Sequence, residues 1–260
     1  MFVTTSFHPG TIETQEAREL AALLEIPYVK RERHSLPELF AQMGESRAVV
    51  VTKQGWRVEE KQGLPFFFHP NMSALRIKQL LNGDRDAMVD SAELRPGDQV
   101  LDCTLGMGAD AIVAAFAVGE EGKVVALESE PVIAAIVKRG LETYQTDRNA
   151  LNEAMRRVEV IQADYRSYLP QCQDDSFDVV MFDPMFRETV RASTAMQQLK
   201  PLANPHPLDE GAVREALRVA RRAVLLKERP KGGEFARLGF EIVKSSSNFA
   251  WGVIRKGGGR

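Results

Sequence analysis

Residues 98–118 read DQVLDCTLGMGADAIVAAFAV, and this stretch decides the fold. A short apolar run ends at Asp102, Gly106 and Gly108 follow in a loop, and a segment rich in alanine and valine comes next. Glycines let the backbone turn tightly and lie close to a ligand. The first turn of the following helix directs its amide groups toward the same place. The stretch therefore predicts a strand, a ligand-binding loop and a helix.

The same alternation continues toward the C-terminus. The expected strands span residues 98–103, 123–129, 158–163, 177–182 and 223–228, and the expected helices span residues 109–118, 131–144 and 209–223. Strands that alternate with helices predict a parallel sheet covered on both faces. Two last apolar runs, 240–245 and 249–255, are joined by a short polar connection typical of an antiparallel hairpin. We predict a Rossmann-like α/β fold, because five such strands closed by a hairpin are the pattern of a class I methyltransferase.

The first 65 residues show a different pattern and no chemical motif. Strands are expected at 2–7 and 28–32, helices at 11–26 and 35–44, and a hairpin at 47–61 that turns at Gln54 and Gly55. Two more helices are expected from about residue 73 and over 84–94. We therefore expect a small N-terminal α/β domain at residues 1–65 and a larger domain at residues 66–260.

Composition excludes several classes of protein. The chain of 260 residues is 44% hydrophobic and 27% charged, which is ordinary for a globular protein. It contains no apolar run long enough for a membrane span and no signal-like N-terminus. The two cysteines, Cys103 and Cys172, are far apart, and the four histidines form no ligand cluster. We expect a cytoplasmic protein without a metal site, and the sequence leaves its oligomeric state open.

Charge is distributed unevenly although the net charge is only −2. Residues 1–186 carry about ten more acids than bases, and residues 187–260 carry about eight more bases than acids. Such asymmetry is one sign of an anionic partner. The alternative is a solvated helix face made by Arg214, Arg218, Arg221 and Arg222, and the sequence does not decide between them.

The glycine loop fits two kinds of cofactor. GMGADA matches the loose dinucleotide pattern G-x-G-x-x-A, and Glu128 lies twenty positions beyond Gly108. However, Asp102 lies four residues before Gly106, and its carboxylate would repel a pyrophosphate. A carboxylate at this place suits S-adenosylmethionine, which carries an ammonium and a sulfonium but no phosphate. The sequence favours this methyl donor over NAD.

Acidic residues recur where four of the expected strands end. They are Asp102, Glu128, Asp164 and Asp183. In an open α/β sheet these ends face one crevice, where ligands bind. Glu128 could accept both ribose hydroxyls of the donor, and Asp164, next to Tyr165, could accept from its adenine amino group. Alternatively each acid caps the helix that follows it.

The segment 183–186 reads Asp-Pro-Met-Phe and ends the apolar run DVVMF. It resembles the D/N-P-P-Y/F motif of enzymes that methylate exocyclic amino groups on bases. Such an amine is a poor nucleophile because its lone pair is delocalised. The carboxylate of Asp183 and the carbonyl of Pro184 could accept its two hydrogens, since proline fixes the direction of that carbonyl. Phe186 could stack on the base, so we predict that these three residues are catalytic; a buried Asp-Pro turn is the alternative.

Several motifs together resemble the RsmJ-like family of small-subunit (16S) ribosomal RNA guanine-N2 methyltransferases. They are DCTLGMGADA, ALESEP, QADY, DPMF and RRAVLLKERP, within a likeness that spans about Phe66 to Arg255. The resemblance implies an S-adenosylmethionine-dependent enzyme acting on RNA. It also implies donor contacts at Ala109, Asp110, Glu128, Ser129, Asp164, Tyr165 and Asp183, beside Asp102, Gly106 and Gly108. Two positions depart from the family pattern, which has arginine at Ala109 and proline at Arg187.

An RNA substrate requires cations for its phosphates. The candidates are Arg187, Arg191, Lys227, Arg229 and Lys231, although Lys227 could instead extend from a strand end for structural reasons. The target base would have to leave its stack or lie in a single strand. Three rival functions remain: an NAD-dependent oxidoreductase, a methyltransferase acting on a small molecule or protein, and a non-catalytic RNA-binding module.

Overall fold

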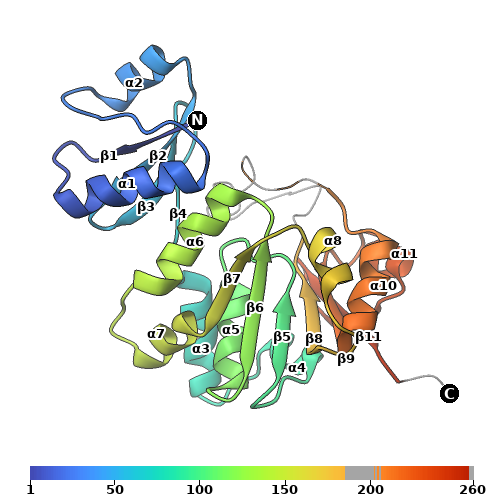
Figure 1. Ribbon diagram of the computed structural model, residues 1–260. Coiled ribbons are helices and arrows are strands. Elements are labelled where there is room, and N and C mark those ends of the chain that lie inside the picture. The colour runs from blue at the N-terminus through green and yellow to red at the C-terminus, as the bar shows by residue number, and fades with distance from the viewer. Residues whose placement is uncertain (185–201, 203, 205, 258–260) are drawn as a thin grey trace.

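The computed structural model describes residues 1–184, 202, 204 and 206–257. Figure 1 shows a small sheet near the N-terminus and a larger sheet covered by helices. The small sheet has the order β1-β2-β3-β4, in which β1 and β2 are parallel and the other neighbours are antiparallel. Its elements are β1 (Phe2–Thr5), α1 (Thr11–Leu23), α2 (Leu36–Met43), β2 (Arg47–Thr52), β3 (Gly55–Glu60) and β4 (Phe66–Phe67).

Two details of the small sheet differ from the sequence prediction. Residues 28–32 are not a strand, because Tyr28 makes only an isolated bridge to Val3. The sheet also continues two residues past position 65, since β4 pairs with β3 through Phe66 and Phe67. The hairpin of β2 and β3 forms as predicted, with Thr52 opposite Gly55.

The large sheet has seven strands in the order β10-β11-β9-β8-β5-β6-β7. Its strands are β5 (Gln99–Asp102), β6 (Lys123–Glu128), β7 (Val158–Gln162), β8 (Phe177–Phe182), β9 (Ala220–Glu228), β10 (Glu241–Ser245) and β11 (Ala250–Arg255). The strands β5 to β9 are parallel, whereas β11 runs antiparallel to both β9 and β10. This confirms the predicted Rossmann-like sheet with its C-terminal hairpin.

Helices cover both faces of the large sheet (Figure 1). They are α3 (Asn71–Leu81), α4 (Ala87–Ala92), α5 (Ala109–Val118), α6 (Pro131–Thr143), α7 (Asn149–Arg156), α8 (Tyr165–Tyr168), α10 (Glu210–Val219) and α11 (Glu234–Leu238), with a 3₁₀ turn at Leu169–Gln171. Successive strand residues point to opposite faces. Val100 therefore packs with the helices α3 to α7, whereas its neighbour Leu101 packs with α8, α10 and α11.

The predicted helix 209–223 was wrong at its C-terminal end. The helix α10 stops at Val219, and β9 begins at Ala220. Arg222 lies on this strand and pairs with Asp98, while Arg221 pairs with Asp178. Helical propensity in the run RVARRA is overridden by these ion pairs and by pairing of β9 with β8 and β11.

A polar contact joins the small sheet and its helix to α6. The indole of Trp56 donates to Glu16 Oε2 at 3.0 Å, and Arg139 of α6 forms an ion pair with Glu16 Oε1. The Arg139 guanidinium also lies 5.6 Å from the centre of the Trp56 ring. Nearby, Phe68 packs closely on Gly140. These contacts fix the N-terminal unit beside the helix that follows β6.

Candidate functional site

Four acids lie where adjacent parallel strands end. The strands β8, β5, β6 and β7 are neighbours in the sheet, and their ends carry Asp183, Asp102, Glu128 and Asp164 in that order. Asp102 lies opposite Ala126 and Met181, so Glu128 and Asp183 each lie two residues farther along their strands. The topology thus brings the four sequence-predicted acids to one edge of the sheet.

The glycine loop connects β5 to α5 and supports the acid of the next strand. Gly106 and Gly108 have φ of 50° and 76°, a region that favours glycine. Gly108 is the N-cap of α5, so Ala109 and Asp110 are the first residues of the helix. The amide of Gly106 donates to Glu128 Oε2 at 3.1 Å. The loop therefore places its backbone amides beside the end of β6.

Glu128 is a buried acid that lies away from any cation among the described residues. Its side chain accepts from the amides of Gly106 and Glu130, and the residue is only 8% exposed. Burial raises the pKa of Glu128 to about 6, although the two amides lower it. Within the described ranges Glu128 forms no ion pair. A buried carboxylate in this state is suited to accept hydrogen bonds from hydroxyl groups of a ligand.

Asp164 has a structural role as well as a place in the row. It is the N-cap of α8, where its Oδ1 accepts from the amide of Arg166 at 2.8 Å. The capping alternative raised from the sequence therefore holds for this residue, and it leaves Oδ2 for a ligand. Beside it, the Tyr165 ring packs edge-on against Phe182, with centroids 5.4 Å apart. Ser129, after β6, accepts from the Asn204 side chain at 3.4 Å.

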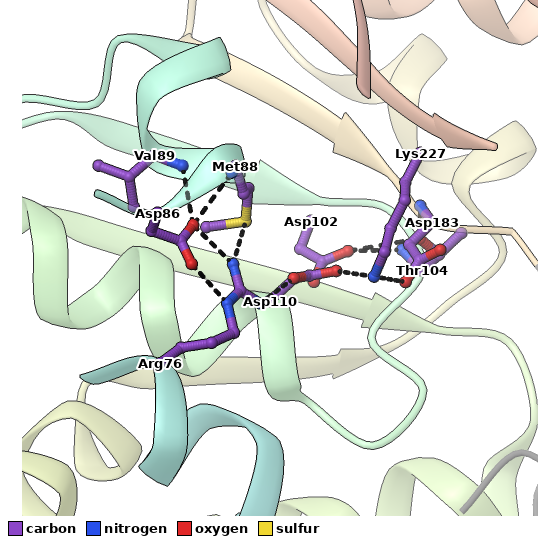
Figure 2. Close-up of polar contacts among 9 residues, drawn as sticks. All are labelled: Arg76, Asp86, Met88, Val89, Asp102, Thr104, Asp110, Asp183 and Lys227. Atoms are coloured by element: carbon purple, nitrogen blue, oxygen red, sulfur yellow. Dashed lines mark hydrogen bonds and ion pairs between the residues drawn. The ribbon is translucent and has the colours of Figure 1, made fainter. Parts of the chain in front are cut away.

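A chain of ion pairs crosses the site from α3 to β8 (Figure 2). Its members, in order, are Asp86, Arg76, Asp110, Lys227 and Asp183. The Lys227 ammonium lies 2.7 Å from Asp183 Oδ2 and 3.1 Å from Asp110 Oδ2. The sequence prediction had placed Lys227 with the phosphate-binding cations; in the structure it pairs with two carboxylates.

Charges within this chain set the ionisation of its members. Burial opposes the charge of Asp110, yet Lys227 and Arg76 hold its pKa well below the usual range. Burial raises the pKa of Asp183 to about 6. Lys227 lowers this pKa, but the nearby Asp110 raises it and offsets part of that effect. Burial also raises the pKa of Asp102 to about 7, helped by the carboxylates of Asp110 and Asp183. Asp110 is therefore firmly ionised, whereas the pKa values of Asp183 and Asp102, like that of Glu128, are raised toward neutral pH.

The backbone at the end of β8 is held by the glycine loop. The amide of Asp183 donates to Thr104 Oγ1 at 2.6 Å, and the amide of Thr104 donates to Asp102 Oδ1 at 2.9 Å. Pro184 follows and is half-buried. Asp183 keeps 32% of its side chain exposed despite its contact with Lys227. One catalytic candidate is thus fixed in place and still accessible.

The other predicted substrate contacts are placed only in part. Phe186, Arg187 and Arg191 lie outside the described residues. Arg229 and Lys231 lie in the connection after β9, where Arg229 is half-buried and Lys231 is exposed. Three C-terminal arginines form ion pairs within the protein: Arg218 with Asp174 and Glu215, Arg221 with Asp178, and Arg222 with Asp98. These pairs neutralise part of the C-terminal excess of positive charge.

Sequence reasoning missed Arg76 and Asp86 as members of the site. Arg76 lies on α3 and reaches Asp110, 34 residues away, while Asp86 accepts from two of its nitrogens at 2.7 and 2.9 Å. Asp86 also caps α4 through the amides of Met88 and Val89. An acid before a helix was visible in the sequence, but nothing there indicated that Arg76 points toward the start of α5.

The chemistry of this donor set fits S-adenosylmethionine. The edge of the sheet offers carboxylates for hydroxyl and ammonium groups, and Glu128 has no cationic partner among the described residues. A pyrophosphate would meet Asp102 at the position where a dinucleotide fold supplies free amides. In the described ranges no group of three or more histidine, cysteine or acidic residues is arranged to hold a metal ion. Nor do those ranges contain a helix long and apolar enough to cross a membrane.

Comparison with known families and proteins agrees with this donor. Residues 46–240 match the model of the family described as "Putative SAM-dependent methyltransferase". The chain is 40% identical over 254 residues to the uncharacterized protein YpiP of Bacillus subtilis, covering 97% of this chain and 98% of that one. That relative extends the likeness through the N-terminal 65 residues.

Other relatives are ribosomal RNA small subunit methyltransferases J. The enzyme of Pseudoalteromonas atlantica is 28% identical over 231 residues, which cover 85% of each chain. The enzyme of Hydrogenovibrio crunogenus is 35% identical over 137 residues, which cover 51% of this chain and 48% of that one. Among solved structures, the SAM-dependent methyltransferase NGO1261 of Neisseria gonorrhoeae matches with a TM-score of 0.68 at 14% identity, covering 100% and 98% of the two chains. At that identity the match supports the fold alone.

Proposed function

This chain belongs to the SAM-dependent methyltransferase family matched by residues 46–240, and from that premise we propose that it methylates an exocyclic amine of a nucleic-acid base. S-adenosylmethionine is its cofactor. We propose guanine N2 of small-subunit ribosomal RNA as the acceptor. The observation that carries the proposal is Asp183-Pro184 at the end of β8, next to Asp102 and Glu128 on the neighbouring strands.

The donor would lie along the row of acids. We propose that Glu128 accepts from the ribose hydroxyls, while Asp164 and Tyr165 hold the adenine ring. Asp102 and the loop from Gly106 to Asp110 would face the methionine part, with Ser129 beside the ribose. When bound, S-adenosylmethionine supplies an electrophilic methyl group. Support for this arrangement comes from Asp164, whose capping bond uses Oδ1 and whose side chain is partly exposed. Further support comes from Glu128, which is buried without an ion pair among the described residues.

The acceptor would be held by the segment after β8. The carboxylate of Asp183 and the carbonyl of Pro184 would accept the two hydrogens of the amine, and Phe186 would stack on the base. Asp183 would take up the proton that the amine loses on methylation, which is consistent with a pKa raised to about 6. Holding both reactants in line can lower a barrier by about 7 to 11 kcal/mol relative to free reactants. No covalent bond to the protein is needed.

RNA as the acceptor has support from relatives and from charge. Several relatives are named ribosomal RNA small subunit methyltransferases, and the connection after β9 carries Arg229 and Lys231. We propose that these two residues, with Arg187 and Arg191, contact RNA phosphates. Such contacts position the RNA without reading its sequence.

Fractionation of labelled products tests the class of acceptor. The protein would be incubated with methyl-labelled S-adenosylmethionine and a lysate of a strain deleted for its gene, and RNA, protein and small molecules would then be separated. We expect the label in small-subunit RNA, at a level that falls with rising salt. Label confined to protein or to small molecules would contradict the proposal and leave a methyltransferase of another acceptor.

A further inference from the structure

The position of Lys227 is fixed by strand pairing, by two aromatic rings and by two carboxylates. It is the eighth residue of β9, opposite Trp251 of β11 and one residue past the pairing of Leu226 with Phe182. Its ammonium lies 5.3 Å from the ring centres of both Trp251 and Phe249. The side chain is 20% exposed. Aromatic rings on one side and carboxylates on the other hold a cation in one place.

The Lys227 ammonium lies between the carboxylates of Asp183 and Asp110 (Figure 2). Lys227 contacts Oδ2 of Asp183 and Oδ2 of Asp110. Asp110 has a second cation, Arg76, whereas among the described residues only Lys227 forms an ion pair with Asp183. Lys227 contacts Oδ2, and within the described residues no hydrogen bond to the other oxygen of Asp183 is seen, so we expect that oxygen to accept from a substrate.

The surrounding charges determine how Lys227 affects the ionisation of Asp183. Four acids, Asp86, Asp102, Asp110 and Asp183, surround two cations, Arg76 and Lys227. Without Lys227, Asp183 would lie near two other carboxylates, and no other cation of the described residues forms an ion pair with it. A like charge disfavours ionisation and an opposite charge favours it. Lys227 therefore works against protonation of Asp183, while Asp110 works for it.

We propose that Lys227 is a positioning residue for methyl transfer: its ammonium holds Oδ2 of Asp183, keeps that carboxylate ionised and orients its other oxygen toward the acceptor amine. The inference rests on the function proposed above for Asp183. It replaces the phosphate-binding role predicted for Lys227 from the sequence. The two carboxylates offset the positive charge of the Lys227 ammonium, so its attraction for a distant phosphate is weak.

Titration of Asp183 tests the pairing without any acceptor. The carboxyl ¹³C shift of Asp183, assigned with Asp183→Asn, would be followed with pH in the full-length protein. We expect a midpoint near 6 in the wild type, as the raised pKa indicates. Lys227→Met should raise the midpoint by at least about one pH unit, and Lys227→Arg should restore it. Asp110→Asn should lower it, which tests the same cluster if Lys227→Met does not fold.

Kinetics on a small-subunit RNA transcript tests the consequence. Asp183 is active as the carboxylate, so the acid limb of kcat should move to higher pH in Lys227→Met. A shift of one pH unit from a midpoint near 6 should lower kcat at pH 7 at least about twofold. The salt dependence of RNA binding should stay unchanged. Lys123→Met, which removes an exposed ion pair with Glu159, is the matched control and should change neither property.

The outcomes separate the two proposals. An unmoved Asp183 midpoint in folded Lys227→Met and Asp110→Asn would overturn the role of Lys227. So would a smaller salt dependence of RNA binding with an unmoved acid limb, which is the result a phosphate contact gives. Shifted midpoints together with a wild-type enzyme that methylates no RNA would overturn the proposed acceptor and leave the pairing standing.

Discussion

We expect Glu128 to make the binding of S-adenosylmethionine at the proposed donor site depend on pH. Its pKa is raised to about 6 by burial, so the carboxylate form is lost as pH falls through that value. Because the carboxylate is the stronger acceptor for two hydroxyls, binding of S-adenosylmethionine should weaken below pH 6. Calorimetry at pH 5 and pH 8 would measure the change in Kd.

Glu128→Gln should remove this dependence on pH and weaken the binding of S-adenosylmethionine. Loss of hydrogen bonds to a charged acceptor costs about 1.5 to 3 kcal/mol, so Kd at pH 8 should rise roughly 10- to 150-fold. The exposed Glu121→Gln, at the other end of β6, is the matched control. Equal Kd values for Glu128→Gln and wild type at pH 8 would contradict the ribose contact.

At the scale of single residues, the sequence placed the acids but not their partners. Asp102, Glu128 and Asp183 could be assigned to one edge because each ends an apolar run, and parallel strands end on the same side. Lys227 and Asp183 are 44 residues apart, and their pairing depends on β9 lying next to β8. Local sequence does not indicate which side chains meet across neighbouring strands, so the ion pairs of Lys227 with Asp183 and Asp110 could not be predicted. The roles of Phe186, Arg187 and Arg191 stay predictions.

Among the elements, α6 links the donor site to the N-terminal unit. It begins at Pro131, three residues after Glu128, and carries Arg139 and Gly140 against that unit. A Cβ at Gly140 would overlap the side chain of Phe68, which is buried and packs on Tyr144. Close packing at this point therefore requires glycine within the helix.

Gly140→Ala should destabilise the protein although alanine favours a helix. The gain in propensity is about 1 kcal/mol, and overpacking costs about 1 to 3 kcal/mol. We expect the free energy of unfolding to fall by up to about 2 kcal/mol in urea denaturation, as the difference of these terms. Adding Phe68→Leu should make the loss smaller than the sum of the single changes. A more stable Gly140→Ala variant would contradict the packing described here.

Element prediction succeeded where periodicity was strong and failed where tertiary contacts decided. The five parallel strands and the final hairpin formed as predicted, because their apolar runs are long and bounded by turns. The end of α10 was misplaced because Arg221 and Arg222 look helical but lie on β9. The short strand β4 was not predicted, since two residues carry no periodic signal.

For the whole molecule, we propose that the N-terminal unit of about 65 residues is a domain of its own. It has a separate sheet, and the contact of Glu16 and Trp56 with Arg139 ties it to the larger sheet through α6. The two tryptophans of the chain report on the two units, because Trp56 lies on β3 and Trp251 on β11. The sequence could suggest the unit from its change of pattern, but not the face by which it docks.

Removing the Arg139 contact should uncouple the two units. In Arg139→Ala, urea unfolding followed through Trp56 should have a lower midpoint than unfolding followed through Trp251. Single-tryptophan variants, Trp251→Phe and Trp56→Phe, would separate the signals. The exposed Lys138→Ala, on the same helix, is the control. Coincident transitions in Arg139→Ala would contradict independent domains.

The most direct test of the central claim is the identity of the methylated nucleoside. Small-subunit RNA would be labelled from S-adenosylmethionine by wild type, by Asp183→Ala and by the exposed control Asp84→Ala, then digested to nucleosides. The account predicts label in N2-methylguanosine for wild type and control, and a loss of at least about 100-fold for Asp183→Ala. Label on a ribose or a ring carbon, or full activity in Asp183→Ala, would contradict it.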